Sequence, residues 1–200
     1  MNSLANKLSQ TATNMIRMDH THILATFHQY EIDTRPKTKQ VLVDTACLAL
    51  EIHAQLEEEI FYPALRTLSP DNATLEKSVP EHIEMRRLIA RLRAMKPKDP
   101  EYDETFMELM RDMLHHAADE ETILLPEAER LMTADRLSEL GAQMTKRRLQ
   151  LVSPHTRETA SSMMRGLSTR SMLVAAGAVL AGTYLAKRSG GYANSRALYK

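Results

Sequence analysis

A phrase that runs from His to Pro and occurs twice constrains this 200-residue chain more than any other feature. In both copies a Glu follows the His by four residues, a second Glu comes directly after it, and the Pro stands ten positions after the His. The copies run from His53 to Pro63 and from His116 to Pro126. On a helix, residues four apart lie one turn from each other on the same face, so the His and the first Glu of each copy can reach one metal site.

A further His stands upstream of each copy at almost the same distance. His20 precedes His53 by 33 residues, and His82 precedes His116 by 34 residues. Unrelated surface residues would have to produce two aligned copies and two matched offsets by coincidence, so we predict a metal site. Its predicted ligands are His20, His53, Glu57, His82, His116 and Glu120.

The first 152 residues have the pattern of helices separated by short turns. No glycine precedes Gly141, and the alternation of apolar and polar residues that is typical of strands is missing. We expect helices at about 13–30, 37–63, 69–95 and 101–126, the third capped by Ser69, with a later start at Ser78 as its alternative. Short turns make neighbouring helices antiparallel, so these four form an up-down-up-down bundle with the four His residues at one level.

The predicted fold is therefore all-α. It comprises a four-helix bundle at 12–130, a fifth amphipathic helix at 133–152 capped by Thr133, a linker at 153–170, an apolar helix at 171–188 and a disordered tail at 189–200. The uncharged stretch from Met172 to Ala186 would span about 22 Å as a helix, which is short of the ~30 Å hydrocarbon core of a bilayer. A membrane anchor and a docked or self-associating helix both stay open.

Composition limits the location and the partners. The 26 basic and 26 acidic residues cancel and are well mixed, so no global field attracts nucleic acid. The single cysteine, Cys47, fits a reducing compartment and is predicted to be a buried core residue. No apolar segment of a secretory signal is evident at the N-terminus. We expect a cytoplasmic protein, with membrane association through the C-terminal segment as the alternative.

Counting ligands favours two metal ions over one. Each ion would take two imidazole nitrogens, and Glu57 and Glu120 would each bridge both ions. A single tetrahedral zinc would leave two of the six groups without a metal. Imidazole and carboxylate ligands inside a helical bundle favour redox-active iron, whereas zinc and manganese stay open.

Two nearby residues have competing interpretations. His115 also precedes an acidic residue by four positions, but its offset to Pro126 does not match the first copy, so His116 is the predicted ligand. Tyr62 is interpreted as a core-packing residue, with a redox or hydrogen-bonding role at the site as the alternative.

The remaining acidic neighbours are interpreted by their position along the helices. Glu58, Glu59 and Glu121 are predicted to form a solvated acidic face, with a supporting role behind the ligands as the alternative. For Asp19 and Glu81, orientation of a neighbouring group and simple exposure to solvent are equally good interpretations.

The pattern of His20, His53 with Glu57, His82, and His116 with Glu120 resembles the hemerythrin-like, or HHE cation-binding, domain family. The resemblance covers about residues 12–130 and implies an antiparallel four-helix bundle around a carboxylate-bridged, non-heme di-iron centre. Oxygen-carrying hemerythrins have a second His four residues after the first in the third helix, where this chain has Arg86. They also have an Asp five residues after the His of the fourth helix, where this chain has Glu120 at four.

One imidazole fewer than in the oxygen carriers implies a more open centre. We therefore expect a di-iron protein that binds or senses a small oxidant, namely oxygen, peroxide or nitric oxide, in an oxidative-stress or oxygen response. Two alternatives stay open. One is a di-iron enzyme with peroxidase-like, catalase-like or nitric-oxide-handling activity, and the other is an interaction module with a structural metal.

Overall fold

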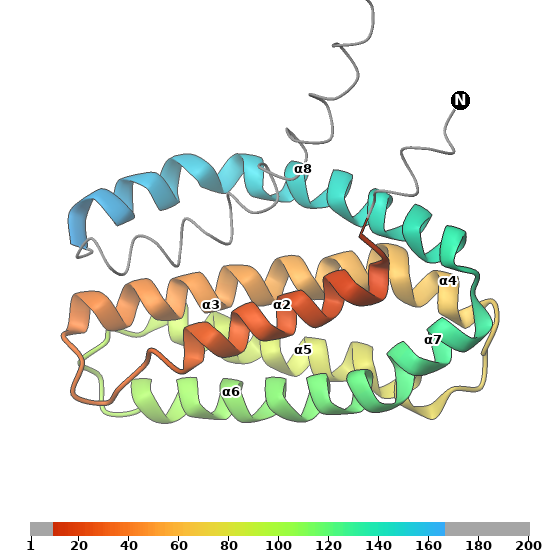
Figure 1. Ribbon diagram of the computed structural model, residues 1–200. Coiled ribbons are helices and arrows are strands. Elements are labelled where there is room, and N and C mark those ends of the chain that lie inside the picture. The colour runs from red at the N-terminus through yellow and green to blue at the C-terminus, as the bar shows by residue number, and fades with distance from the viewer. Residues whose placement is uncertain (1–9, 167–200) are drawn as a thin grey trace, which may run out of the picture.

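The computed structural model describes the backbone of residues 10–166 and the side chains of residues 10–152, and every regular element in this part is a helix (Figure 1). Four long helices run alternately up and down and pack side by side, as the sequence predicts. They are α2 (Ala12–Phe27), α3 (Pro36–Leu56), α5 (Ala73–Ala94) and α6 (Tyr102–Asp119).

Both copies of the repeated phrase end in a wide π-helical turn. These turns are η1 (Glu57–Phe61) and η2 (Glu120–Leu124), and the chain then continues into α4 (Tyr62–Arg66) and α7 (Leu125–Leu131). The N–H of Tyr62 donates to the Glu57 carbonyl, and the N–H of Leu125 donates to the Glu120 carbonyl. The extra residue in η1 lets Phe61 and the following Tyr62 both face the interior. Turns of this π-helical kind are frequent at functional sites.

The start of α5 differs from the prediction. Asn72, and not Ser69, caps the helix, because its side-chain oxygen accepts from the N–H of Leu75 at 2.9 Å. Ser69 instead donates to Glu127 of α7 at 2.8 Å, so it links the segment before α5 to α7. The alternative start at Ser78 is also wrong, since that residue and Pro80 both lie inside the helix.

A fifth helix, α8 (Ala134–Gly166), crosses the bundle over α2, α3 and η1 (Figure 1). Thr133 caps it as predicted, since its hydroxyl accepts from the N–H of Arg136 at 3.2 Å. The helix runs past the predicted end at residue 152, through Pro154 and most of the predicted linker, and reaches Gly166.

Gly141 sits where α8 crosses the beginning of α2. A Cβ atom at this position would lie 1.9 Å from the carbonyl oxygen of Gln10. Real Cβ contacts are never this short, so only a residue without a side chain permits this approach. Gly141 therefore fixes how closely α8 can dock.

Two apolar clusters fill the bundle, and the predicted ligands lie between them. One cluster centres on Phe27, Leu88 and Phe106 and includes Cys47, which is 1% exposed, as predicted. The other cluster joins η1 and η2 to α8. Polar groups between two apolar layers are cut off from water and must find partners inside the protein.

Within residues 10–166, no helix is long and apolar enough to cross a bilayer. The predicted apolar helix at 171–188 and the tail at 189–200 lie outside the described residues, as does the last part of the predicted linker.

Candidate metal centre

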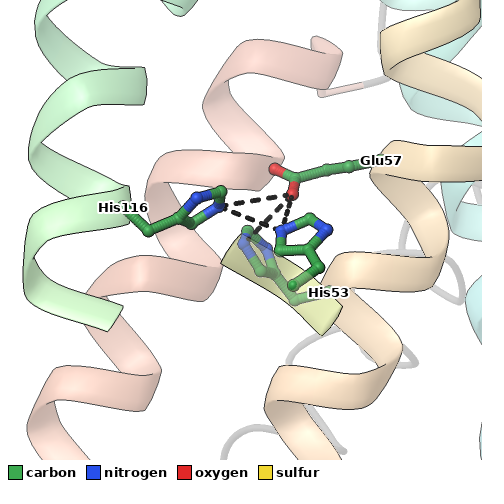
Figure 2. A group of neighbouring side chains, drawn as sticks. His53, Glu57 and His116 are labelled. Carbon is green, nitrogen blue, oxygen red and sulfur yellow. Dashed lines mark hydrogen bonds and ion pairs between the residues drawn. The ribbon is translucent and has the colours of Figure 1, made fainter. Parts of the chain in front are cut away.

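The structure brings all six predicted ligands together in the bundle interior. They are at most 1% exposed and come from four helices and their π turns. Figure 2 shows His53, Glu57 and His116 pointing toward one another. Two overlapping groups have ligand atoms that all lie within 4.8 Å of one another, and both groups contain His53 and Glu57. The groups are His53, Glu57, His82 and His116, and His20, His53, Glu57 and Glu120.

The imidazoles form two pairs that follow the two halves of the sequence. The ring centroids of His20 and His53 are 4.9 Å apart, and those of His82 and His116 are 4.6 Å apart. The Nε2 atoms of the second pair approach to 3.0 Å. Each half of the chain thus places two nitrogen donors at one side of the cluster.

The two carboxylates lie between these pairs. Oε2 of Glu57 is 3.3 Å from Nε2 of His53 and 3.4 Å from Nε2 of His82. Oε2 of Glu120 is 3.2 Å from Nε2 of His20 and 3.5 Å from Nε2 of His116. Each carboxylate therefore contacts one imidazole of each pair, which is the placement that a bridging ligand requires.

Several of these buried atoms have no hydrogen-bond partner in the described part of the chain. They include Nε2 of His20, Nε2 of His53, Oε1 of Glu57 and Oε2 of Glu120. A buried polar atom without a partner costs about 1–3 kcal/mol, so a group of four at one point is unfavourable for the protein alone. Metal cations would supply partners to all four, and the donor set fits them.

Glu121 and Glu58 hold the outer nitrogens of one imidazole in each pair. A carboxylate oxygen of Glu121 is 2.8 Å from Nδ1 of His20, and one of Glu58 is 2.9 Å from Nδ1 of His82. When Nδ1–H donates to a carboxylate, the Nε2 lone pair is free to face the cluster. The prediction of a plain solvated face is thus wrong for Glu58 and Glu121, because each reaches across to a helix of the other half of the chain.

Glu81 and Asp19 face the outer nitrogens of the other two imidazoles. A Glu81 oxygen is 2.8 Å from Nδ1 of His116, and an Asp19 oxygen is 3.8 Å from Nδ1 of His53. Burial raises the pKa of Asp19, but His53 and the Arg148 guanidinium outweigh it and lower the pKa to about 2. Of the two interpretations left open for these acids, orientation of a neighbouring group describes the structure.

Tyr62 is part of the site, contrary to its interpretation as a packing residue. Its hydroxyl donates toward Glu120 Oε1 at 2.8 Å and Glu57 Oε2 at 3.1 Å, and its ring stacks on His82 with centroids 5.7 Å apart. The matching position of the second copy is Leu125. The repeat therefore gave no signal for this residue, since the alignment of the copies pairs it with an apolar side chain.

Protonation of the site follows from burial and crowding. Burial and the nearby Glu120 carboxylate raise the pKa of Glu57 to about 8. Burial raises the pKa of Glu120, but the adjacent His20 imidazole and the charge of His116 outweigh it and lower the pKa. Burial lowers the pKa of His116, but the Glu57 carboxylate nearby and the hydrogen bond to Glu81 outweigh it and raise the pKa to about 10. Without metal at neutral pH, Glu57 and His116 therefore hold protons that a cation would displace.

His115, the rival to His116 as a ligand, and Arg86, which replaces a His of the oxygen carriers, both lie away from the cluster centre. His115 is exposed, whereas its neighbour His116 is fully buried, so the offset to Pro126 selects the interior residue. Arg86 projects to the rim, where Nη1 is 2.9 Å from Glu58. In oxygen-carrying hemerythrins, this position of the third helix holds a second His. Here Arg86 pairs with Glu58, the acid that contacts Nδ1 of His82.

Comparisons with known proteins agree with this geometry. A solved structure of a hemerythrin HHE cation-binding-domain protein from Mycobacterium kansasii superposes with a TM-score of 0.64 at 20% identity, covering 79% of this chain and 99% of that one, which shows the fold. A protein of Nostoc sp. (strain PCC 7120) named a DNA nickase is 28% identical over 120 residues, or 60% of this chain and 34% of the relative. The family described as the hemerythrin HHE cation binding domain matches residues 11–128. The chain belongs to this family.

Proposed function

We propose that this domain binds two iron ions and that the loaded centre binds or senses a small oxidant, namely oxygen, peroxide or nitric oxide. The observation that carries the proposal is the placement of Glu57 and Glu120 between two imidazole pairs. One ion would take His20 and His53, the other would take His82 and His116, and each carboxylate would reach both. Zinc and manganese would accept the same donors, but zinc cannot exchange electrons with an oxidant, and four imidazoles suit iron better than manganese.

The residues around the centre support this role by fixing its donors. Three outer carboxylates lie within hydrogen-bond distance of Nδ1 of His20, His82 and His116, so that Nε2 of each ring faces inward, and Asp19 lies 3.8 Å from Nδ1 of His53. When bound, a redox-active metal pair would supply the electrons that a small oxidant accepts. The bundle excludes bulk water, since the ligands are at most 1% exposed, and this strengthens every electrostatic contact inside.

Size also favours a small ligand. A hollow of about 360 Å³ opens beside the site and is lined in part by Glu58, Tyr62 and Val79. Tyr62 separates this hollow from Glu57 and Glu120, because its hydroxyl contacts both carboxylates. The six donors behind Tyr62 are at most 1% exposed, so a molecule of two to four atoms could reach them more readily than an extended substrate.

Tyr62 also favours a second candidate, an enzyme with peroxidase-like or catalase-like activity at the same centre. Burial and the two neighbouring carboxylates raise the pKa of Tyr62, so its hydroxyl keeps its proton at neutral pH. A hydroxyl that points into the site is placed to give a hydrogen bond or a proton to a reacting peroxide.

Metal analysis of the purified protein tests the proposal. We expect two irons per chain, a visible absorption band that changes when peroxide, oxygen or nitric oxide is added, and loss of both in Glu57→Ala. Glu59→Ala is the matched control, since Glu59 lies two residues on and pairs with Arg147 at the surface. Oxygen release from peroxide would identify the enzyme. One zinc per chain with no response to any oxidant would contradict the proposal and favour a structural metal.

A further inference from the structure

Arg148 of α8 reaches the metal centre from outside the part of the chain that defines the family. The family match ends at residue 128, whereas Arg148 lies near the middle of the fifth helix. Buried Leu140 and Met144 anchor that helix to the bundle. The guanidinium that follows them therefore has a fixed position relative to α2.

The partner of Arg148 is Asp19, the residue directly before His20. Nη1 of Arg148 is 2.7 Å from Oδ1 of Asp19, and Nη2 donates to Oδ2, so the contact is bidentate. Asp19 is 7% exposed, and its Oδ2 lies 3.8 Å from Nδ1 of His53, which is the distance of an ion pair and not of a hydrogen bond. A chain of three groups thus runs from α8 through a buried carboxylate to an imidazole of the cluster.

The other half of the centre receives no such support from the described side chains of the fifth helix, which end at residue 152. Glu81 occupies the position that matches Asp19 and faces His116, but its cationic neighbour is Lys77 from the same helix, at 3.8 Å. The Glu81 side chain is 31% exposed and can exchange its partner for water. Asp19 is enclosed, so the direction of its carboxylate depends on the guanidinium that α8 brings.

We propose that Arg148 is a positioning residue for the metal centre: it holds Asp19, and through it His53, so that docking of α8 and metal binding stabilise each other. This inference rests on the proposed metal binding. His53 belongs to both ligand groups, so its orientation affects the whole cluster. Because coupling between two events is reciprocal, metal at the site must also tighten the docking of α8.

Removal of the guanidinium while the metal ligands stay intact tests this coupling. Arg148→Ala is the test variant, and Arg147→Ala is its matched control. Arg147 is 33% exposed against 32% for Arg148, and it makes a bidentate pair with Glu59, which faces Gln55 and not an imidazole. Both variants remove one bidentate ion pair between α8 and the bundle.

Anaerobic calorimetry with Fe²⁺ gives the first readout. Loss of a group behind a metal ligand typically weakens metal binding 10- to 100-fold, so we expect roughly a tenfold weaker affinity in Arg148→Ala. Arg147→Ala should stay within about twofold of the parent protein, because its partner does not orient a ligand. Arg148→Lys keeps the charge without the bidentate geometry and should recover part of the loss.

Amide hydrogen exchange over residues 134–152 gives a readout that is independent of affinity. Metal should slow exchange in the parent protein and in Arg147→Ala, and it should slow exchange much less in Arg148→Ala. Equal Fe²⁺ affinities in the two alanine variants, or equal protection of α8 by metal, would overturn the inference. A parent protein that binds no metal would overturn the proposed function instead. Thermal unfolding of the metal-free variants checks that both are folded.

Discussion

Removal of the Tyr62 hydroxyl measures how much this group stabilises the carboxylates of the site when no metal is bound. Tyr62→Phe removes one oxygen and its proton and leaves the ring stacked on His82, so no cavity large enough to matter is formed. The hydroxyl has one proton to share between Glu57 and Glu120, so it counts as a single hydrogen bond to a charged acceptor. Such a bond contributes about 1.5–3 kcal/mol. We expect the metal-free variant to lose that much free energy of unfolding.

Metal should reduce this loss. Cations would neutralise the Glu120 carboxylate, which is the charged acceptor, and the hydroxyl would then contribute about 0.5–1.5 kcal/mol, as an ordinary hydrogen bond does. The difference of about 1 kcal/mol appears in the thermodynamic cycle as metal binding that is roughly fivefold tighter in Tyr62→Phe than in the parent protein. The same substitution thus weakens the fold and strengthens the site.

Urea unfolding at pH 7, followed by circular dichroism with and without metal, measures both effects. Tyr102→Phe is the control, because the Tyr102 hydroxyl is buried in the other apolar cluster and has no hydrogen-bond partner among the side chains of residues 10–152. Its removal should be neutral or stabilising. If the two Phe variants lose the same free energy of unfolding without metal, the hydroxyl does not stabilise the carboxylate pair and the reasoning is wrong.

Three further predictions concern other parts of the molecule. Gly141→Ala should lower the free energy of unfolding by about 1–3 kcal/mol in urea, although alanine favours helices, because its Cβ would meet the Gln10 carbonyl. Metal binding should strengthen as pH rises from 6 to 8 and release roughly two protons near pH 7, measured in weak buffer, since Glu57 and His116 are protonated below pKa values of about 8 and 10. Burial raises the pKa of Cys47 to about 12, so iodoacetamide should label it only after unfolding.

The six central residues could be predicted because helix geometry ties them to the sequence. A His and a Glu four residues apart share a face in any helix, and short turns bring the mid-points of four helices to one level. The same offset distinguished His116 from His115. These relations are local or follow from simple topology, so a single sequence is enough to reveal them.

The second layer of the site could not be predicted in the same way. Glu121 faces His20 from 101 positions away, and Glu58 faces His82 from 24 positions away. Such partners depend on how the π turns rotate one helix against another. Tyr62 has Leu125 as its counterpart, so comparison of the copies hid it, and Arg148 meets Asp19 only because α8 folds back over the bundle.

The prediction of where α5 begins failed for a related reason. Ser69 has the residue type of a cap, but its hydroxyl bonds to Glu127 of a distant helix, and Asn72 caps α5 instead. Both residues satisfy the propensity rules equally well. Tertiary contacts decide between them.

The crossed pairing of acids and imidazoles makes the two halves of the chain interdependent. His20 takes its outer acid from the second half, and His82 takes its outer acid from the first. A peptide that ended after α4 would keep two imidazoles yet leave one of them without its orienting acid. It could complete the set only by pairing with another copy of itself around a two-fold axis, so the smallest self-sufficient unit is either the whole bundle or a dimer of halves.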